Sequence, residues 1–165
     1  MAWIVIVLGA LLVIGPIFWI MPSARDRRLA ELRSTAAKLG LELADVELPQ
    51  TRRQRVRLEE TQRGMLYRAP LLQKPAVPVP LVRWVREAPD APWVREGEPP
   101  LEWSARLDAV LEQLPRSVCA FELGARGPAI YWREQGNEET VRQLAALLKP
   151  LAAELRGRTD AEEEP

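Results

Sequence analysis

The chain has 165 residues, with 23 basic and 23 acidic side chains, one cysteine and no histidine. Without histidine it lacks the commonest general base and metal ligand, and zinc rarely accepts carboxylates alone. One cysteine excludes an intramolecular disulfide framework, and the apolar run around Cys119 predicts a buried small residue rather than a nucleophile. We therefore expect no catalytic site, no metal site and no cofactor.

The first 22 residues form the most apolar stretch of the chain. From Ala2 to Met21 no residue carries a formal charge. A helix of that length covers about 30 Å, the thickness of a hydrocarbon core. Aromatic residues suited to the headgroup level stand near both ends, namely Trp3, Phe18 and Trp19. The pattern predicts a transmembrane anchor over residues 1–22, in contact with a lipid bilayer, and its length is unlike that of a cleaved signal peptide.

Basic residues follow this stretch closely: Arg25, Arg27, Arg28 and Arg33. By the positive-inside rule they predict an external N-terminus and a cytoplasmic domain. A basic amphipathic helix is expected over residues 23–40, because Ser23 and Asp26 have capping-box spacing and Gly40 supplies a stop. Two interpretations of this juxtamembrane helix stay open, namely contact with a lipid surface and packing on the domain's own sheet.

The densest basic cluster lies at Arg52, Arg53, Arg55 and Arg57, after a predicted strand with a bulge over residues 41–48. If the cluster is extended, Arg53, Arg55 and Arg57 share one face, and if it is helical they scatter. Three interpretations of the cluster stay open: contact with phospholipid, contact with an acidic protein, and exposure to solvent alone. Nucleic acid is disfavoured, because no aromatic residues interleave with the arginines.

Residues 41–157 read as one domain. Strands are predicted at residues 65–68, 79–86 and 92–95, with a proline-rich connector over residues 70–80. Trp84 and Trp93 are interpreted either as a cross-strand core pair or as an exposed aromatic contact site.

The C-terminal part is predicted as a helix over residues 101–114, a hairpin of strands 117–123 and 128–133, and a helix from Asn137 to Gly157. The charged tail, residues 158–165, is expected to be disordered. The expected fold class is α+β, an N-terminal transmembrane helix followed by a two-layer antiparallel sheet domain with two or three packing helices.

Acidic pairs do not suggest catalysis. Glu59-Glu60 and Glu138-Glu139 are adjacent, so the side chains of each pair point apart. Glu122 and Glu134 flank the hairpin, where we expect them to lie on a solvated strand face. The chain is therefore predicted not to be an enzyme.

The segment from Gly15 to Arg28, Gly-Pro-Ile-Phe-Trp-Ile-Met-Pro-Ser-Ala-Arg-Asp-Arg-Arg, and the later Leu39-Gly40-Leu41 resemble small single-pass proteins of Gram-negative bacteria labelled YajC-like. YajC itself is an ancillary subunit of the Sec translocon. The resemblance covers about the first forty residues and implies a bacterial inner-membrane location with a cytoplasmic domain. It carries over no functional residue.

Two functional hypotheses follow. The first is a non-enzymatic, membrane-anchored interaction module that contacts another membrane complex such as the secretion translocase. The second is a binder of anionic lipid headgroups or a small ligand through the Arg52–Arg57 cluster.

Overall fold

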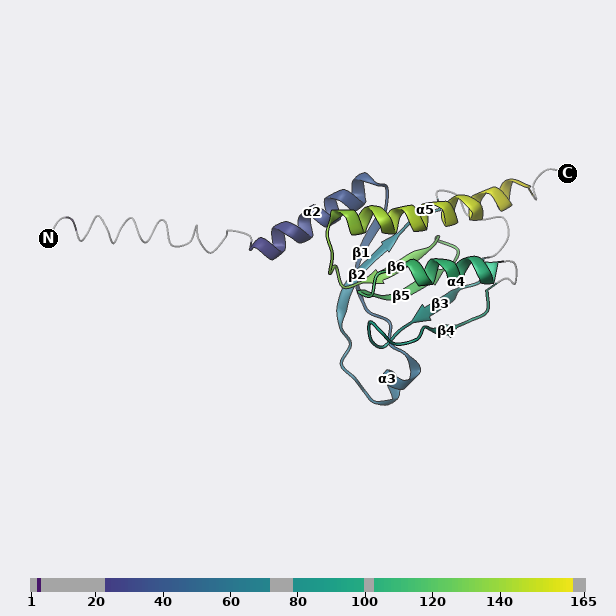
Figure 1. The fold of residues 1–165 in the computed structure, drawn as a ribbon, viewed down its shortest axis with the longest axis horizontal. Coiled ribbons are helices and arrows are strands. Elements are labelled where there is room, and N and C mark those ends of the chain that lie inside the picture. Colours follow the sequence, from purple (N-terminus) through teal and green to yellow (C-terminus); the bar gives the residue numbers. More distant parts are fainter. Residues whose placement is uncertain (1–2, 4–22, 72–78, 100–102, 162–165) are drawn as a thin grey trace.

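The computed structural model describes residues 3, 23–71, 79–99 and 103–161, and the side chains of these residues as far as Arg156. Within these ranges the chain is α+β, with one six-stranded antiparallel sheet in the order β1-β2-β6-β5-β3-β4 (Figure 1). The elements in chain order are α2 (Ala24–Lys38), β1 (Glu42–Glu47), α3 (Arg52–Val56), β2 (Arg63–Arg68), β3 (Val82–Val85), β4 (Val94–Glu96), α4 (Ser104–Gln113), β5 (Val118–Leu123), β6 (Ala129–Trp132) and α5 (Glu138–Ala161).

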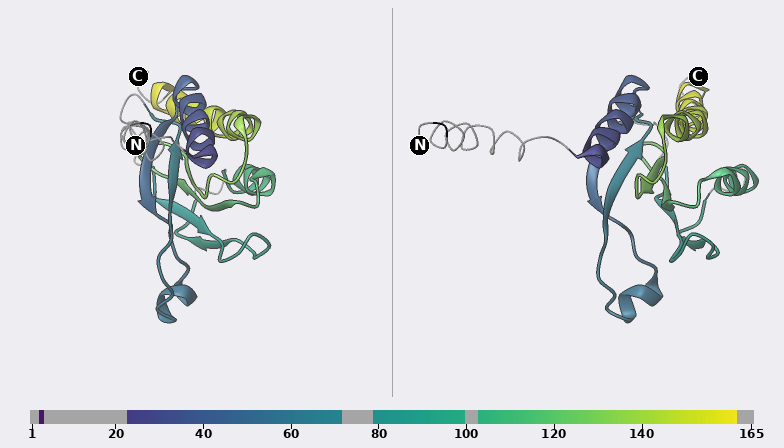
Figure 2. Two further views of the ribbon diagram at one scale, coloured as in Figure 1. Left: turned by 90° about the vertical axis from the view of Figure 1, so that its left-hand side faces the viewer. Right: turned by 60° about the vertical axis from the view of Figure 1, so that its left-hand side comes forward.

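The main core lies between one face of the sheet and helices α2, α4 and α5 (Figure 2). Alternate strand residues such as Tyr67, Phe121 and Trp132 supply the sheet side and are fully buried. Leu107 of α4 and Leu144 of α5 supply the helix side and are also fully buried. Each such side chain contributes about 1.5–3 kcal/mol of transfer free energy, so this layer holds the three helices on the sheet.

Helix α2 packs on the domain's own core. Its capping box is present, because Asp26 N–H donates to Ser23 Oγ at 3.1 Å and Ser23 N–H donates to Asp26 Oδ2 at 3.1 Å. Leu32 and Ala36 are buried in the main core, beside α5. The face of α2 that carries Leu32 and Ala36 therefore packs on the domain's own core, which is the second of the two interpretations of the predicted basic helix.

The bulge predicted in the first strand is wrong. β1 pairs with β2 without a register shift, from Glu42 opposite Arg68 to Glu47 opposite Arg63. The irregularity lies instead in β5, between Val118 and Ala120. Its extra residue lets Val118 and Phe121 both face the helices, while Ala120 faces the opposite side of the sheet.

Helix α5 is longer than predicted. Asn137 caps it, with Thr140 N–H donating to Asn137 Oδ1 at 3.0 Å. The helix continues through Pro150 and past Gly157, where its end was expected, to Ala161. Glycine lowers helix stability without abolishing it, so Gly157 alone did not stop the helix. Residues 162–165 of the predicted tail lie outside the described residues.

The transmembrane part of the predicted fold class requires correction. No helix within the described ranges is long and apolar enough to cross a membrane. The single-pass membrane assignment is therefore not supported. All residues of the predicted span 1–22 except Trp3 lie outside the described residues, Phe18 and Trp19 among them.

Candidate binding groove beside helix α3

The arginine cluster is helical, so its side chains are distributed around α3. Thr51 caps the helix: Gln54 N–H donates to Thr51 Oγ1 at 3.3 Å, and Thr51 N–H donates to Gln54 Oε1 at 3.0 Å. The Thr51 hydroxyl also donates to Glu87 Oε1 at 2.7 Å. Because Thr51 is buried, this bond fixes the start of α3 to the end of β3.

A second contact ties α3 to the sheet edge. Arg55 Nη2 lies 3.0 Å from Glu96 Oε1 on β4. Of the four arginines of the cluster, Arg55 is therefore engaged in a structural ion pair, although both partners remain partly exposed. Arg52 and Arg53 on α3 and Arg57 at its C-cap have exposed side chains.

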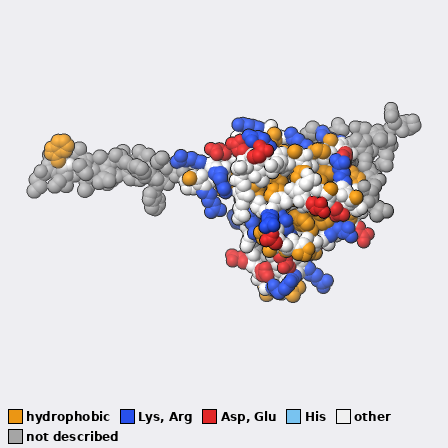
Figure 3. Space-filling view, in the orientation of Figure 1, with side chains coloured by type: hydrophobic (Ala, Val, Ile, Leu, Met, Phe, Trp, Pro, Cys, Tyr) orange, Lys and Arg blue, Asp and Glu red, His pale blue; other side chains and the backbone are white. Residues whose placement is uncertain are grey.

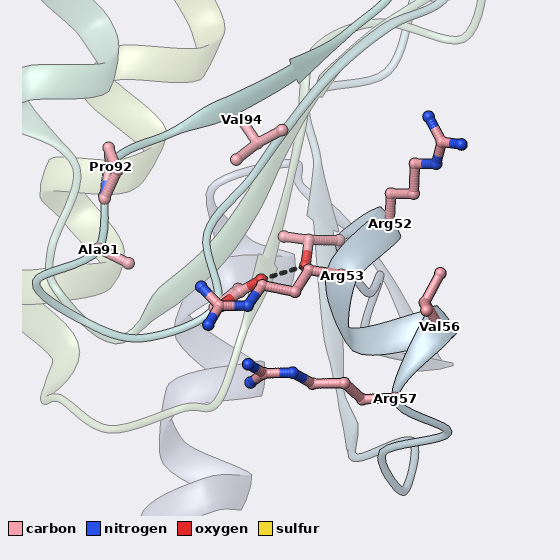
Figure 4. Close-up of a pocket in the computed structure, with 9 residues that line it drawn as sticks. Arg52, Arg53, Val56, Arg57, Ala91, Pro92 and Val94 are labelled. Carbon is pink, nitrogen blue, oxygen red and sulfur yellow. Dashed lines mark hydrogen bonds between the residues drawn. The ribbon is translucent and has the colours of Figure 1, made fainter.

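A groove of about 690 Å³ opens between α3 and the β3–β4 turn, and we call it the arginine groove. Arg53 and Arg57 extend side by side across it, whereas Arg52 points away from them (Figure 4). The groove is lined by Thr51, Arg52, Arg53, Val56, Arg57, Glu87, Ala91, Pro92 and Val94. Two parallel guanidinium groups beside apolar walls can bind a ligand that combines an anionic group with an apolar part.

The guanidinium groups in this groove are only weakly neutralised. Within the described part of the chain, Arg52 and Arg53 make no ion pair within 4.0 Å, and Arg57 Nη1 lies 3.7 Å from Glu59 Oε1. Glu87 also lines the groove, where its Oε1 accepts a hydrogen bond from the Thr51 hydroxyl, so one carboxylate lies beside these guanidinium groups. In the space-filling view, basic side chains gather over the start of α2, whereas basic and acidic side chains lie next to each other at the end of the molecule that α3 forms (Figure 3).

The two tryptophans singled out from the sequence are not a cross-strand pair. The register places Arg95, not Trp93, opposite Trp84. Trp84 is buried and packs against Phe121, with ring centroids 5.6 Å apart. Trp93 lies under Arg86, whose Cζ is 4.3 Å from the ring centroid.

The tryptophans still meet at a second surface feature, which we call the Trp cleft. This cleft of about 450 Å³ lies between β4 and α4 and is lined by Trp84, Trp93, Arg95, Asp108, Leu111 and Glu112. Asp108 and Glu112 are one helical turn apart and exposed, and neither makes an ion pair with a described residue. The cleft therefore carries two carboxylates against one guanidinium.

The arginines expected to set a membrane topology have other partners here. Arg33 donates to the Glu134 carboxylate, with Nε to Oε1 at 2.9 Å and Nη2 to Oε2 at 2.6 Å. Arg28 Nη2 donates to the Glu134 carbonyl at 3.2 Å. Arg25 and Arg27 lie exposed in the first turn of α2. Arg28 and Arg33 therefore fasten α2 to the segment that follows β6.

Glu122 and Glu134 are buried, so the expectation that they lie on a solvated face is wrong. Glu122 Oε2 accepts hydrogen bonds from Arg83 Nη2 at 2.6 Å and from the Tyr131 hydroxyl at 2.8 Å. Arg68 Nη2 lies 3.4 Å from Glu122 Oε1. The sequence signal for this cluster is that Glu122 is the single acidic residue in the otherwise apolar β5. Its partners could not be identified without the strand register.

The net effect of these contacts is to lower the pKa of Glu122. Burial alone would raise that pKa, but the hydrogen bonds from Arg83 and Tyr131, together with the charge of Arg68, lower it below its ordinary value. Burial raises the pKa of Tyr131 to about 12, and the Glu122 carboxylate adds to this. The cluster is a carboxylate held by donors from three strands, although the buried Arg68 Nε has no hydrogen-bond partner among the described residues. These contacts are suited to fixing β2, β3 and β6 against β5.

The single thiol gives no sign of activation. Cys119 is buried, as expected, and burial raises the pKa of its thiol despite the nearby Arg133 and Arg86 guanidinium groups. In the ranges that the structure describes, no group of three or more Cys, Asp or Glu side chains is placed to hold a metal ion.

Comparisons of this chain with protein-family models, with curated proteins and with solved structures find no match.

Proposed function

We propose that this domain is a non-enzymatic binding module that holds an acidic peptide segment of a partner protein in the arginine groove. One observation carries the proposal: Arg53 and Arg57 extend in parallel into an apolar-walled groove, and Arg53 has no acidic partner among the described residues (Figure 4). Guanidinium groups that are held in parallel and only weakly neutralised are suited to a carboxylate-bearing ligand.

The rigidity of the helix supports this role. The Thr51–Glu87 hydrogen bond and the Arg55–Glu96 ion pair hold the two ends of α3 against the β3–β4 segment. Arg53 and Arg57 therefore start from a fixed backbone, which lowers the ordering cost when a ligand binds.

The groove walls favour a peptide over a small inorganic anion. Val56, Pro92 and Val94 supply apolar surface that a phosphate or a free carboxylate would leave uncovered. Val56 is 76% exposed and Val94 is 45% exposed, so both gain from being covered. The volume of about 690 Å³ accommodates several side chains rather than one headgroup.

Fluorescence anisotropy with a labelled octapeptide of alternating Glu and Val tests the proposal. We expect saturable binding that weakens several-fold as NaCl rises from about 50 to about 200 mM, because exposed charge pairs are screened. The combined Arg53→Gln and Arg57→Gln variant should weaken binding about tenfold or more.

The combined Arg25→Gln and Arg63→Gln variant is the matched control, since it removes the same two positive charges from exposed residues that do not line the groove. Its affinity should stay within about threefold of the unmodified protein. Equal losses for both variants would reduce the site to general surface charge and overturn the proposal. Full displacement of the peptide by equimolar inorganic phosphate would also overturn it, in favour of a small-anion site. The secretion-machinery partner implied by the YajC-like resemblance stays a prediction.

A further inference from the structure

Strand β4 ends the sheet, with β3 on one side and no described strand on the other. Its residues are exposed or half-buried, and Val94 is 45% exposed. A free strand edge presents backbone groups that another extended chain can pair with.

The register tells which backbone groups face that free edge. Arg86 N–H donates to the Cys119 carbonyl of β5 at 3.0 Å. Because backbone groups alternate in direction along a strand, Val85 directs its own toward β4, where it is paired with Val94. The next residue, Arg95, therefore directs its N–H and C=O away from β3, toward the open side.

Side chains of β4 alternate between two differently charged surfaces. Val94 lines the arginine groove, while Trp93 and Arg95 line the Trp cleft on the other face of the strand. The groove offers the Arg53 and Arg57 guanidinium groups, and the cleft offers the Asp108 and Glu112 carboxylates.

We propose that β4 pairs with an extended peptide of a partner protein whose acidic and basic side chains alternate. An added strand places successive side chains on the same two faces as Val94 and Arg95. Acidic residues then enter the arginine groove, and basic residues between them enter the Trp cleft. This inference rests on the proposed function for its acidic half and adds the mode of binding and the second face.

The other sheet edge does not offer the same arrangement. β1 carries Glu42, Asp45 and Glu47, which are charged residues of the kind that protect a strand edge. The charged residues of β1 itself are all acidic, and Arg126 lies 3.5 Å from one of them, Glu42. β4 instead lies between two surfaces of opposite charge.

Two octapeptides of identical composition test the alternation. One alternates Glu and Lys, and the other has a block of Glu followed by a block of Lys. Both have the same net charge, so a surface that senses charge alone binds them equally. We expect the alternating peptide to bind about fivefold or more tighter. Equal affinity would overturn the inference.

Substitutions at Arg95 test the backbone pairing. Arg95→Pro removes the outward N–H at a position where an edge strand tolerates proline, and should weaken the alternating peptide about tenfold. Arg95→Gln keeps the N–H and removes a competing cation from the cleft, so its affinity should equal or exceed that of the unmodified protein. Thermal unfolding of both variants establishes that they are folded.

A measurement on the unmodified protein does not depend on any variant. Hydrogen exchange of the Arg95 amide, followed by NMR, should slow several-fold when the alternating peptide saturates the protein. Unchanged exchange at saturation would overturn strand addition. The combined Asp108→Asn and Glu112→Gln variant should weaken the alternating peptide and leave the Glu-Val peptide unaffected.

The variants distinguish a failure of the proposed function from a failure of strand addition. If Arg53→Gln with Arg57→Gln weakens binding but Arg95→Pro does not, the arginine groove stands and strand addition is wrong. If Arg95→Pro weakens binding and the arginine substitutions do not, the arginine groove is wrong as the acidic-residue site.

Discussion

Arg33 on α2 places its guanidinium against both carboxylate oxygens of Glu134, which follows β6, at 2.9 and 2.6 Å. Glu134 is 6% exposed and adopts a positive φ of 54°, and Tyr67 donates its hydroxyl to the same carboxylate at 2.9 Å. The hydrogen bond that Arg33 donates to the Glu134 carboxylate raises the pKa of Arg33. This contact joins residues 101 positions apart in the chain and fixes α2 on the sheet.

Glu134→Gln should therefore destabilise the domain by about 2–3 kcal/mol, since it leaves a buried Tyr67 hydroxyl and the Arg33 guanidinium without their charged acceptor. Urea unfolding followed by circular dichroism measures this. The control is Arg25→Gln on the exposed first turn of α2, which should stay within about 0.5 kcal/mol. Equal effects of the two substitutions would contradict a role for the carboxylate in docking α2.

The Glu122 cluster predicts an acid dependence of stability. Because the folded pKa of Glu122 is depressed below its ordinary value of 4.5, its contribution is present above that value and lost as pH falls through the folded pKa. The stability difference between the unmodified protein and Glu122→Gln should therefore shrink between about pH 5 and pH 3. Denaturant titrations at several pH values measure it. Glu31→Gln, on the exposed face of α2, serves as the control, and a difference that grows on acidification would contradict the prediction.

The two tyrosines of the chain should ionise late. Burial raises the pKa of Tyr131 from 10.0 to about 12, and burial together with the Glu134 carboxylate raises the pKa of Tyr67 well above its ordinary value. The stability that each protonated hydroxyl contributes is present below pH 10.0 and lost as pH rises through its folded pKa.

Phenolate absorbance during an alkaline titration checks this prediction. We expect a step near pH 12 that Tyr131→Phe removes and Tyr67→Phe leaves in place. Circular dichroism at each point establishes that the domain is still folded. An absorbance step near pH 10.0, with the folded spectrum intact, would contradict the burial of these hydroxyls.

Gly127 in the β5–β6 turn should tolerate no side chain. Its φ is +109°, and an added Cβ would lie 2.2 Å from the Ala69 carbonyl oxygen. Gly127→Ala should therefore cost about 3 kcal/mol or more, from backbone strain and a clash with main chain. Gly40 has φ +74° with nothing within 4 Å, so Gly40→Ala isolates the strain alone at about 1 kcal/mol. Similar midpoints of thermal unfolding for both variants would show that the close approach at Ala69 is unimportant.

Local patterns in the sequence accounted for several elements. The periodicity over residues 101–114 predicted the helix observed as Ser104–Gln113, and the Ser23–Asp26 spacing predicted the start of α2. For the arginine cluster the sequence left an extended and a helical conformation open, and the capping-box spacing of Thr51 and Gln54 favours the helix that is observed. Capping boxes and helical periodicity depend on contacts within a few residues, so a short stretch of sequence is enough to predict them.

The register of the strands and the partners of the charged side chains could not be predicted from a short stretch of sequence. The spacing of Trp84 and Trp93 suited a cross-strand pair in a hairpin. In the observed register Arg95 lies opposite Trp84, and Trp93 contacts Arg86. The observed partner lies two residues beyond the expected one, so Trp93 stays on the same face of the sheet as Trp84 and Arg95. The apolar residues near the turn did not specify this register.

By itself the sequence determined that the chain lacks histidine, that its basic residues concentrate at Arg52–Arg57, and where its capped helices begin. Only the tertiary structure decided that Arg53 and Arg57 share a groove while Arg55 binds Glu96, and that Glu122 and Glu134 are buried. The physical reason is that capping and helical periodicity act over three or four residues. The partner of a charge is set by strand register and helix packing between segments far apart in the chain.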